Sequence, residues 1–324
     1  MFQRYYAAAI QTDFPCPSSR NDMWQLTRRM GQLIEETITV YEPIGDVRLL
    51  VFPEFAHAAP IYDEVPKLRE HLGVAIPNEH TEFLQKIASK YGCYVQTGTF
   101  LETDPKYAEI IFNTTVLIGP EGICLKYRKV NPWIPWEVHA SPLDVPDYSE
   151  PYFPVAETEI GVIGAAICYD WLFPETIREL ATQGADIVNR VSAYMDPWGT
   201  ASPMEWWTLV NRTRALENLV YVVAANQGAS RANFPPFSWP GGSMIVDFEG
   251  RILAQAETGG GERIVIAPVD IHALRQERQR RYGHHMLAHL RTKAYGYLQK
   301  PGLGAPSKHP ISVDETRKRI DENR

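Results

Sequence analysis

The stretch GVIGAAICYDWLFPE, residues 161–175, decides the fold, because an apolar strand in it runs directly into a helix. Small residues in its first half permit close packing behind the strand. Pro174 and Glu175 mark the start of the helix. Cys168 lies between the two, where the amide groups of the turn and any neighbouring ammonium favour a thiolate. The turn therefore predicts a reactive cysteine, with backbone N–H groups able to form an oxyanion hole.

Strands and helices alternate on both sides of this stretch, and no composition break divides them, which predicts a single α/β unit. The expected strands are residues 6–11, 47–52, 93–100, 160–167, 185–191, 219–225 and 263–269. The expected helices are residues 21–40, 80–91, 174–183 and 203–217. Two hairpins are expected, one joining 110–118 to 123–127 and one around 247–250.

The C-terminal part of the chain differs in character, because RQERQRRYGHHMLAHL and the residues after it are rich in Arg and His and hold few core candidates. We therefore expect one domain over residues 1–270 and a C-terminal helix and arm over 271–324. The arm is expected to lie on a partner subunit or to fray in solvent, in preference to binding nucleic acid. His284, His285 and His289 lie in this tail without acidic ligands, so no metal site is expected there.

The bulk composition excludes several classes of protein. The 324 residues are 44% hydrophobic and 22% charged, enough to bury a large core. The net charge of -7 and the pI of about 5.8 do not suit a nucleic-acid partner. No run approaches the length of a membrane span, and the N-terminus lacks a signal pattern. We therefore expect a soluble, cytoplasmic protein that does not contact a membrane.

The four cysteines are far apart and form no CxxC pair. Neither a disulfide framework nor a structural zinc site is expected from this spacing. Cys16, Cys93 and Cys124 are expected to pack as small hydrophobic side chains.

Two further strands also end on a reactive side chain. Glu54 follows the apolar run at 49–53, and α/β proteins place their sites at such strand ends. Partial burial there favours a protonated carboxyl, which suits proton transfer. Lys129 ends the hairpin's second strand and could hold a positive charge against a developing oxyanion. Taken singly, Glu54 could equally lie in a surface loop, and Lys129 fits a solvated basic strand end better than a catalytic role.

The joint order of Glu, Lys and Cys resembles the nitrilase superfamily of carbon–nitrogen hydrolases over roughly residues 5–270. Glu54 falls in VFPE, Lys129 in YRK and Cys168 in ICYDWLFPE. The resemblance implies a nitrilase-like αββα sandwich that pairs into an αββααββα homodimer or a higher homo-oligomer. It implies no metal and no organic cofactor.

The segment RKVNPWIPWE, residues 128–137, looks like the RK..PW.P.E stretch of the aliphatic amidase and formamidase branch. The likeness implies that Glu137 helps to position the substrate. The implied activity is hydrolysis of a small-molecule amide to a carboxylic acid and ammonia through a thioester. Cys168 is then the nucleophile, Glu54 the general base and acid, and Lys129 with the Tyr169 backbone N–H the oxyanion partner. A nitrilase and an N-carbamoyl amine or amino acid hydrolase stay open as alternatives, whereas a non-enzymatic scaffold is disfavoured because the whole set is present.

The pocket is expected to differ from that branch in shape or size. Ser192 stands where the branch has Gln, and the bulky Trp171 stands where it has Gly. Arg190 is the one candidate anchor for a substrate carboxylate and could equally be structural. Aromatic residues crowd the expected pocket loops: Phe55, Trp133, Trp136, Tyr169, Trp171, Tyr194, Trp198 and Trp239. Such a wall suits a small neutral amide with an aryl or alkyl group, although several of these rings could pack loops or a dimer interface instead.

Overall fold

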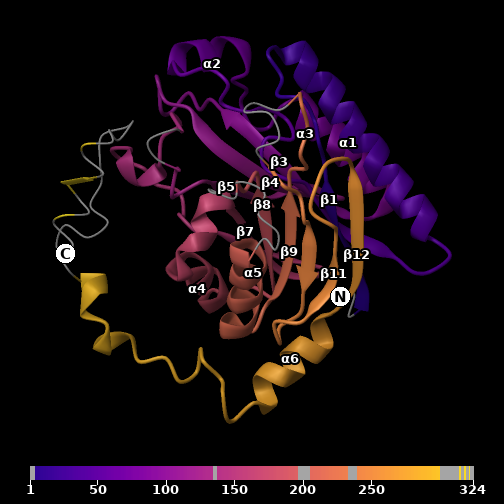
Figure 1. Cartoon of the computed structure of the whole chain (residues 1–324), viewed down its shortest axis with the longest axis vertical. Helices are drawn as coiled ribbons and strands as arrows, with labels where there is room; N and C mark the ends of the chain where they lie inside the picture. Colours follow the sequence, from indigo (N-terminus) through magenta and orange to yellow (C-terminus); the bar gives the residue numbers. More distant parts are fainter. Residues whose placement is uncertain are drawn as a thin grey trace.

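Two six-stranded sheets face each other in the computed structural model, and helices cover their outer faces (Figure 1). The structure describes residues 4–133, 137–195, 205–232 and 239–299, together with Asp314, Arg317, Lys318 and Asp321. Helices α1 and α3 pack on one sheet, and α4 and α5 pack on the other. The predicted αββα sandwich of the α/β class is therefore confirmed.

The first sheet has the strand order β12-β1-β2-β3-β4-β5, and the second has the order β11-β10-β9-β8-β7-β6. The strands of the first sheet are β1 Arg4–Gln11, β2 Val47–Val51, β3 Tyr94–Glu102, β4 Phe112–Gly119, β5 Gly122–Arg128 and β12 Arg263–Asp270. The strands of the second are β6 Val155–Thr158, β7 Gly161–Ile167, β8 Ile187–Ser192, β9 Tyr221–Asn226, β10 Met244–Val246 and β11 Ile252–Gln255. The α-helices are α1 Arg20–Tyr41, α2 Val65–His71, α3 Glu79–Tyr91, α4 Pro174–Thr182, α5 Glu205–Asn218 and α6 Ile271–Arg280.

Strand direction brings several strand ends to one edge of each sheet. Strands β1, β2 and β3 are parallel, and β5 runs the same way as β3 because two antiparallel pairings separate them. In the second sheet β7, β8 and β9 are parallel. Side chains that follow β2, β5 and β7 can therefore meet at the carboxyl ends of the strands, where α/β folds place their sites.

Two apolar cores hold the layers together, and β2 shows how one strand serves both. Leu49 and Val51 belong to the core between the sheets, which extends to α4 and α5. Leu50, between them in the sequence, belongs to the core between the first sheet and helices α1 and α3. Because successive side chains point to opposite faces, a strand buried on both faces must be apolar throughout.

The expected elements agree with the observed ones within a few residues, and the short elements that were not predicted include α2, β6 and a 3-10 helix. Helix α2 has seven residues and only Leu68 fully buried, so it has no apolar periodicity to detect. Strand β6 is a four-residue edge strand. The third is the short 3-10 helix η2, Cys168–Leu172, which forms the turn after β7.

The cysteines behave only partly as expected. All four are free thiols. Cys93 is buried in the core, whereas Cys124 is exposed because β5 is an edge strand. The expectation that Cys124 packs as a buried hydrophobe is therefore wrong.

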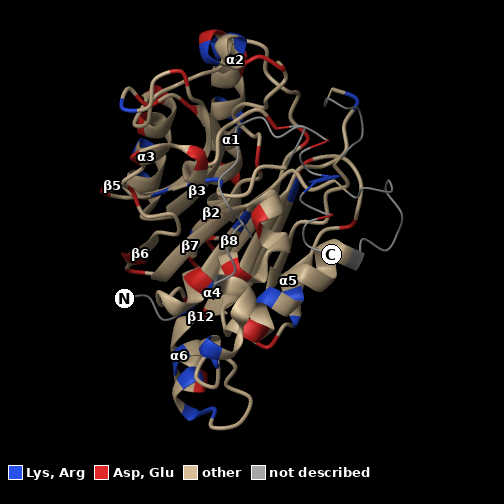
Figure 2. Ribbon diagram, turned by 90° about the vertical axis from the view of Figure 1, so that its left-hand side faces the viewer, with Lys and Arg blue, Asp and Glu red and all other residues tan. Residues whose placement is uncertain are grey.

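Helix α6 carries several arginines, which colour parts of its ribbon blue in Figure 2, and ion pairs hold it against the sandwich. Arg275 and Arg278 lie 2.6 and 3.0 Å from the carboxylate of Asp186, which precedes β8. Beyond α6 the chain runs around the outside of the sandwich (Figure 1), and the Tyr297 hydroxyl donates to Glu175 at the start of α4. The division into 1–270 and a C-terminal arm stays a prediction.

No helix within the described segments has the length and apolar character needed to cross a membrane.

Candidate active site

The three strand ends singled out in the sequence meet in one cavity. Glu54 follows β2, Lys129 follows β5, and Cys168 follows β7. All three line a cavity of about 350 Å³, together with Glu137. We call this space the Glu–Lys–Cys cavity.

A buried lysine holds two carboxylates together at the centre of the site. The Lys129 ammonium lies 2.9 Å from Glu54 Oε1 and 2.8 Å from both oxygens of Glu137. Burial alone would lower the pKa of Lys129, but Glu137 and Glu54 outweigh it and hold that pKa above its ordinary value. The lysine therefore stays protonated between the two carboxyl groups.

Glu54 accepts hydrogen bonds from several directions. Asn113 Nδ2 donates to Oε1 over 2.8 Å, and the Ala193 backbone N–H donates to Oε2 over 3.0 Å. Gln227 Nε2 donates to the Glu54 backbone carbonyl over 3.0 Å. Because each partner is a donor, the carboxylate is aligned as an acceptor, the state a general base needs.

Asn113 was not predicted as a site residue, although it contacts both Glu54 and Lys129. Besides bonding Glu54, its backbone carbonyl accepts from the Lys129 N–H over 2.9 Å. The available signal was an amide side chain inside the otherwise apolar and Thr-containing strand β4.

Cys168 has a strained backbone and a protonated thiol. Its φ of 46° lies in the left-handed region, which is unusual for a residue with a side chain and common at functional turns. Burial raises the pKa of the thiol and the Glu54 carboxylate raises it further, whereas Lys129 and the Ser192 hydroxyl lower it. The net result is a pKa above the ordinary value. The expectation that the turn favours a resting thiolate is therefore wrong, because burial outweighs the ammonium.

Ser192 lies opposite Cys168 across two parallel strands. Ile167 of β7 pairs with Val191 of β8, so the next residues in register are Cys168 and Ser192. Ser192 is fully buried. The residue after it, Ala193, donates its N–H to Glu54. The end of β8 therefore lies against both Cys168 and the Glu54 carboxylate.

Asp170 joins the turn that carries the cysteine to the strand that carries the lysine. Its Oδ2 accepts from the Tyr127 hydroxyl over 2.7 Å and from the Ile167 N–H over 3.0 Å. Its Oδ1 accepts from the backbone N–H and the side-chain amide of Asn131. Burial raises the pKa of Asp170 to about 6, although Lys129 and these donors act against it.

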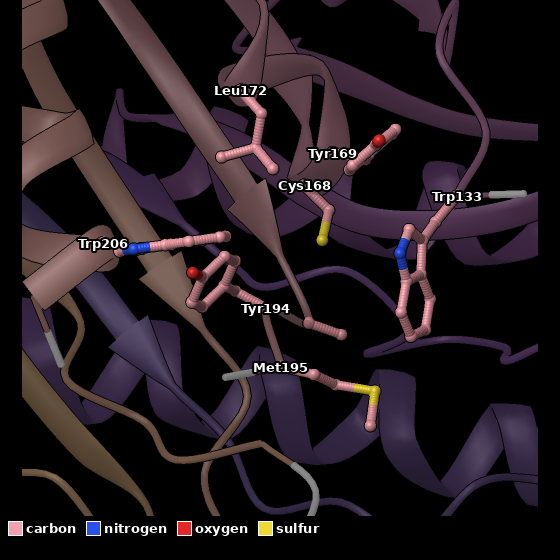
Figure 3. Close-up of a pocket in the computed structure, with 8 residues that line it drawn as sticks. Trp133, Cys168, Tyr169, Leu172, Tyr194, Met195 and Trp206 are labelled. Carbon is pink, nitrogen blue, oxygen red and sulfur yellow. The ribbon is translucent and has the colours of Figure 1, made fainter. Parts of the chain in front are cut away.

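Some of the predicted aromatic residues line cavities at the site, and others lie in the hydrophobic core. Phe55 and Trp239 line the Glu–Lys–Cys cavity, and Trp133 lines it as well. A second cavity of about 260 Å³ adjoins it and is lined by Trp133, Cys168, Tyr169, Leu172, Ala193, Tyr194, Met195 and Trp206 (Figure 3). We call this space the aromatic cavity. Trp136 and Trp198 lie outside the described residues.

Trp171 does not form part of either wall, contrary to expectation. Its side chain is fully buried, and its indole N–H donates to the Ala166 carbonyl over 3.1 Å. The Arg190 guanidinium lies 5.3 Å from its ring centroid. The indole fills the core behind Cys168, so it shapes the pocket only indirectly.

Arg190, like Trp171, lines neither cavity. It is fully buried and stacks over Trp207 at 4.2 Å and over Tyr194 at 5.3 Å. Its Nη1 donates to Asn211 Oδ1 over 2.9 Å. Burial lowers the pKa of the guanidinium to about 10. Arg190 therefore does not reach either cavity as an anchor for a substrate carboxylate.

The comparisons with known proteins agree with this geometry. A model of the carbon-nitrogen hydrolase family matches residues 6–279. The chain is 30% identical over 269 residues to a formamidase of Bacillus thuringiensis (strain Al Hakam), a match that covers 82% of this chain and 74% of the relative.

Solved structures show the same fold. Saccharomyces cerevisiae Nit3, a member of branch 10 of the nitrilase superfamily, matches with a TM-score of 0.69 and 27% identity, over 86% of this chain and 94% of Nit3. A carbon-nitrogen hydrolase of Helicobacter pylori G27 matches with a TM-score of 0.72 and 20% identity, over 92% of this chain and 99% of its own. The chain therefore belongs to the carbon-nitrogen hydrolase family, in the amidase and formamidase branch of the nitrilase superfamily.

Proposed function

We propose that this carbon–nitrogen hydrolase converts a small neutral amide to a carboxylic acid and ammonia through a thioester on Cys168. The observation that carries the proposal is the Lys129 ammonium, held between Glu54 and Glu137 in the cavity that Cys168 lines. This cavity brings together a nucleophile, a proton acceptor and a fixed positive charge, which are the groups that acyl transfer requires.

In the first step the Cys168 proton passes to the Glu54 carboxylate as sulfur attacks the carbonyl carbon. Because burial keeps the pKa of the thiol high, this proton leaves during the attack and not before it. The carbonyl oxygen becomes an oxyanion, which the Lys129 ammonium and the Tyr169 backbone N–H stabilise. The intermediate then collapses, the carbon–nitrogen bond breaks, and Glu54 returns the proton to the departing ammonia.

In the second step Glu54 removes a proton from water as the water oxygen attacks the thioester carbon. The second oxyanion occupies the same place beside Lys129. Its collapse breaks the carbon–sulfur bond, releases the acid and returns the proton from Glu54 to sulfur. Glu137 keeps Lys129 charged and fixed throughout both steps, which is a positioning role.

Two features favour amides over the alternatives. Glu137 occupies the position expected from the amidase-like segment 128–137 and bonds Lys129 through both oxygens. An N-carbamoyl amino acid needs a cationic anchor, and Arg190 is enclosed by aromatic rings. The formamidase relative supports the same choice. A nitrile remains the second candidate, because its hydrolysis would use the same three groups.

The test is ammonia release from matched amides and nitriles of the same acyl group, measured with the wild-type protein and with Cys168→Ala. Cys124→Ala serves as the control, because that thiol is exposed on β5. We expect amide turnover that is lost in Cys168→Ala and kept in Cys124→Ala. Faster turnover of the nitriles would favour the nitrilase, and equal activity of Cys168→Ala would refute the mechanism.

We also propose that two chains pair through the α4 and α5 layer. The outer face of α5 exposes Trp206, Leu209 and Leu216, with exposed fractions of 54%, 62% and 41%. Apolar side chains gathered on one helix face are typical of an interface. The C-terminal arm, whose Tyr297 hydroxyl donates to Glu175 at the start of α4, would then lie beside this layer and contact the partner subunit.

A further inference from the structure

Cys168 lies at the junction of two largely apolar cavities, of which one also carries three charged side chains. The Glu–Lys–Cys cavity and the aromatic cavity share four lining residues, which are Trp133, Cys168, Ala193 and Met195. Figure 3 shows the Cys168 sulfur with Trp133 on one side of it and with Tyr194 and Trp206 on the other. A substrate carbon bonded to this sulfur therefore has space in two directions.

Charge separates the two cavities. Glu54, Lys129 and Glu137 line the first of them. The described lining of the aromatic cavity carries no formal charge other than the one that Cys168 itself can acquire. Leu172 and Trp206 form part of its wall, and they belong to η2 and α5. An apolar substituent is stabilised there, whereas a charged one would lose its hydration without a partner.

The chemistry of the proposed function assigns one half of the substrate to each cavity. The departing nitrogen must receive its proton from Glu54, so it points into the Glu–Lys–Cys cavity. The oxyanion faces Lys129. The remaining substituent on the tetrahedral carbon is the acyl group, which is directed away from the charged groups and toward the aromatic cavity.

We propose that the aromatic cavity is the acyl-binding subsite and that the substrate is an amide of an apolar alkyl or aryl carboxylic acid. This inference rests on the proposed function. The volume supports it, because about 150 Å³ is enough to hold benzene, and the aromatic cavity measures about 260 Å³. A formyl group, whose substituent is a hydrogen atom, would leave the space empty. The preferred acyl group therefore differs from that of the formamidase relatives.

The test is kcat/KM for ammonia release along a series of primary amides from formamide to hexanamide, with benzamide added. Each buried methylene is expected to raise kcat/KM by about fourfold until the cavity is full. Leu172→Trp fills the aromatic cavity, and its ratio of hexanamide to acetamide turnover should fall by about tenfold or more. Leu172→Ala enlarges the cavity, and its ratio of benzamide to acetamide turnover should rise.

Two variants of the same added bulk make the comparison specific. Ile61→Trp narrows the Glu–Lys–Cys cavity, and Ile44→Trp adds an indole on the exposed turn after α1, outside both cavities. Ile44→Trp should keep the wild-type ratio of hexanamide to acetamide turnover. If Ile61→Trp lowers that ratio while Leu172→Trp does not, the acyl group occupies the other cavity and the inference is wrong. Turnover that peaks at formamide also overturns it and leaves the proposed function intact, whereas no amide turnover at all refutes the proposed function itself.

Discussion

Replacement of Asn113 by Leu should impair catalysis far more than folding. The Asn113 side chain is fully buried, and its Nδ2 donates to Glu54 Oε1 over 2.8 Å. A hydrogen bond to a charged group contributes about 1.5–3 kcal/mol, which corresponds to about 10- to 150-fold in rate. Because Lys129 and the Ala193 N–H still hold Glu54, we expect the lower part of this range, a fall of about 10- to 50-fold in kcat/KM.

The free energy of unfolding should change little, since the same side chain carries a buried atom that lacks a partner. Asn113 Oδ1 makes no hydrogen bond within the described structure. Burial of such an atom costs about 1–3 kcal/mol, and Leu removes that cost together with the bond to Glu54. The two effects nearly cancel, so the free energy of unfolding should shift by less than about 1.5 kcal/mol.

Asn189→Leu is the matched control. Asn189 is also fully buried, donates to the neutral Gln96 Oε1 over 3.1 Å, and has an Oδ1 without a partner among the described residues. Amide hydrolysis would be measured alongside urea unfolding for both variants. The reasoning is refuted if Asn113→Leu keeps kcat/KM within about threefold of the wild type. It is refuted equally if both variants lose activity in parallel with stability.

Three other outcomes are expected. Alkylation of Cys168 by iodoacetamide should keep accelerating as pH rises from about 6 to 9, because the raised pKa leaves the thiol neutral throughout. A rate plateau near neutral pH would contradict the raised pKa. Ser192→Ala should slow alkylation at each pH, because the Ser192 hydroxyl lowers the pKa of the thiol. Asp186→Asn should lower the free energy of unfolding by about 2–3 kcal/mol, because two Arg side chains lose a carboxylate that is only 1% exposed. Glu64→Gln, in an exposed pair, should cost less than about 1 kcal/mol, and equal losses in the two variants would count against the account of α6. Removal of residues 281–324 should reduce the number of chains per particle, obtained by dividing the particle mass from light scattering by the mass of the truncated chain, and an unchanged number would exclude a role of the arm in assembly.

Sequence predicted the residues whose position follows from strand direction. Glu54, Lys129 and Cys168 each follow a buried strand, and parallel strands bring such ends together. The same logic does not say which way a bulky side chain points. Trp171 enters the core because its indole finds the Ala166 carbonyl there, a contact that depends on tertiary packing.

The pKa of the Cys168 thiol also could not be predicted from a local sequence pattern. The turn at Cys168 predicted a thiolate, but the pKa of the thiol depends on how burial and Glu54 balance Lys129. That balance involves residues from three separate strand ends. Asn113 was missed for a related reason, because its importance comes from the pairing of β4 with β3 and β5. The sequence shows the amide but not the carboxylate that it meets.

The most direct test of the thioester on Cys168 is the intact mass of the protein. The protein is mixed briefly with an amide that it hydrolyses, and the reaction is quenched in acid. The expected result is a mass increase equal to the acyl group less the one hydrogen lost from the thiol, located on Cys168 by peptide mapping. The adduct should persist in Cys124→Ala and be absent from Cys168→Ala. Amide hydrolysis with full activity in Cys168→Ala, or an acyl adduct on any other residue, would contradict the account.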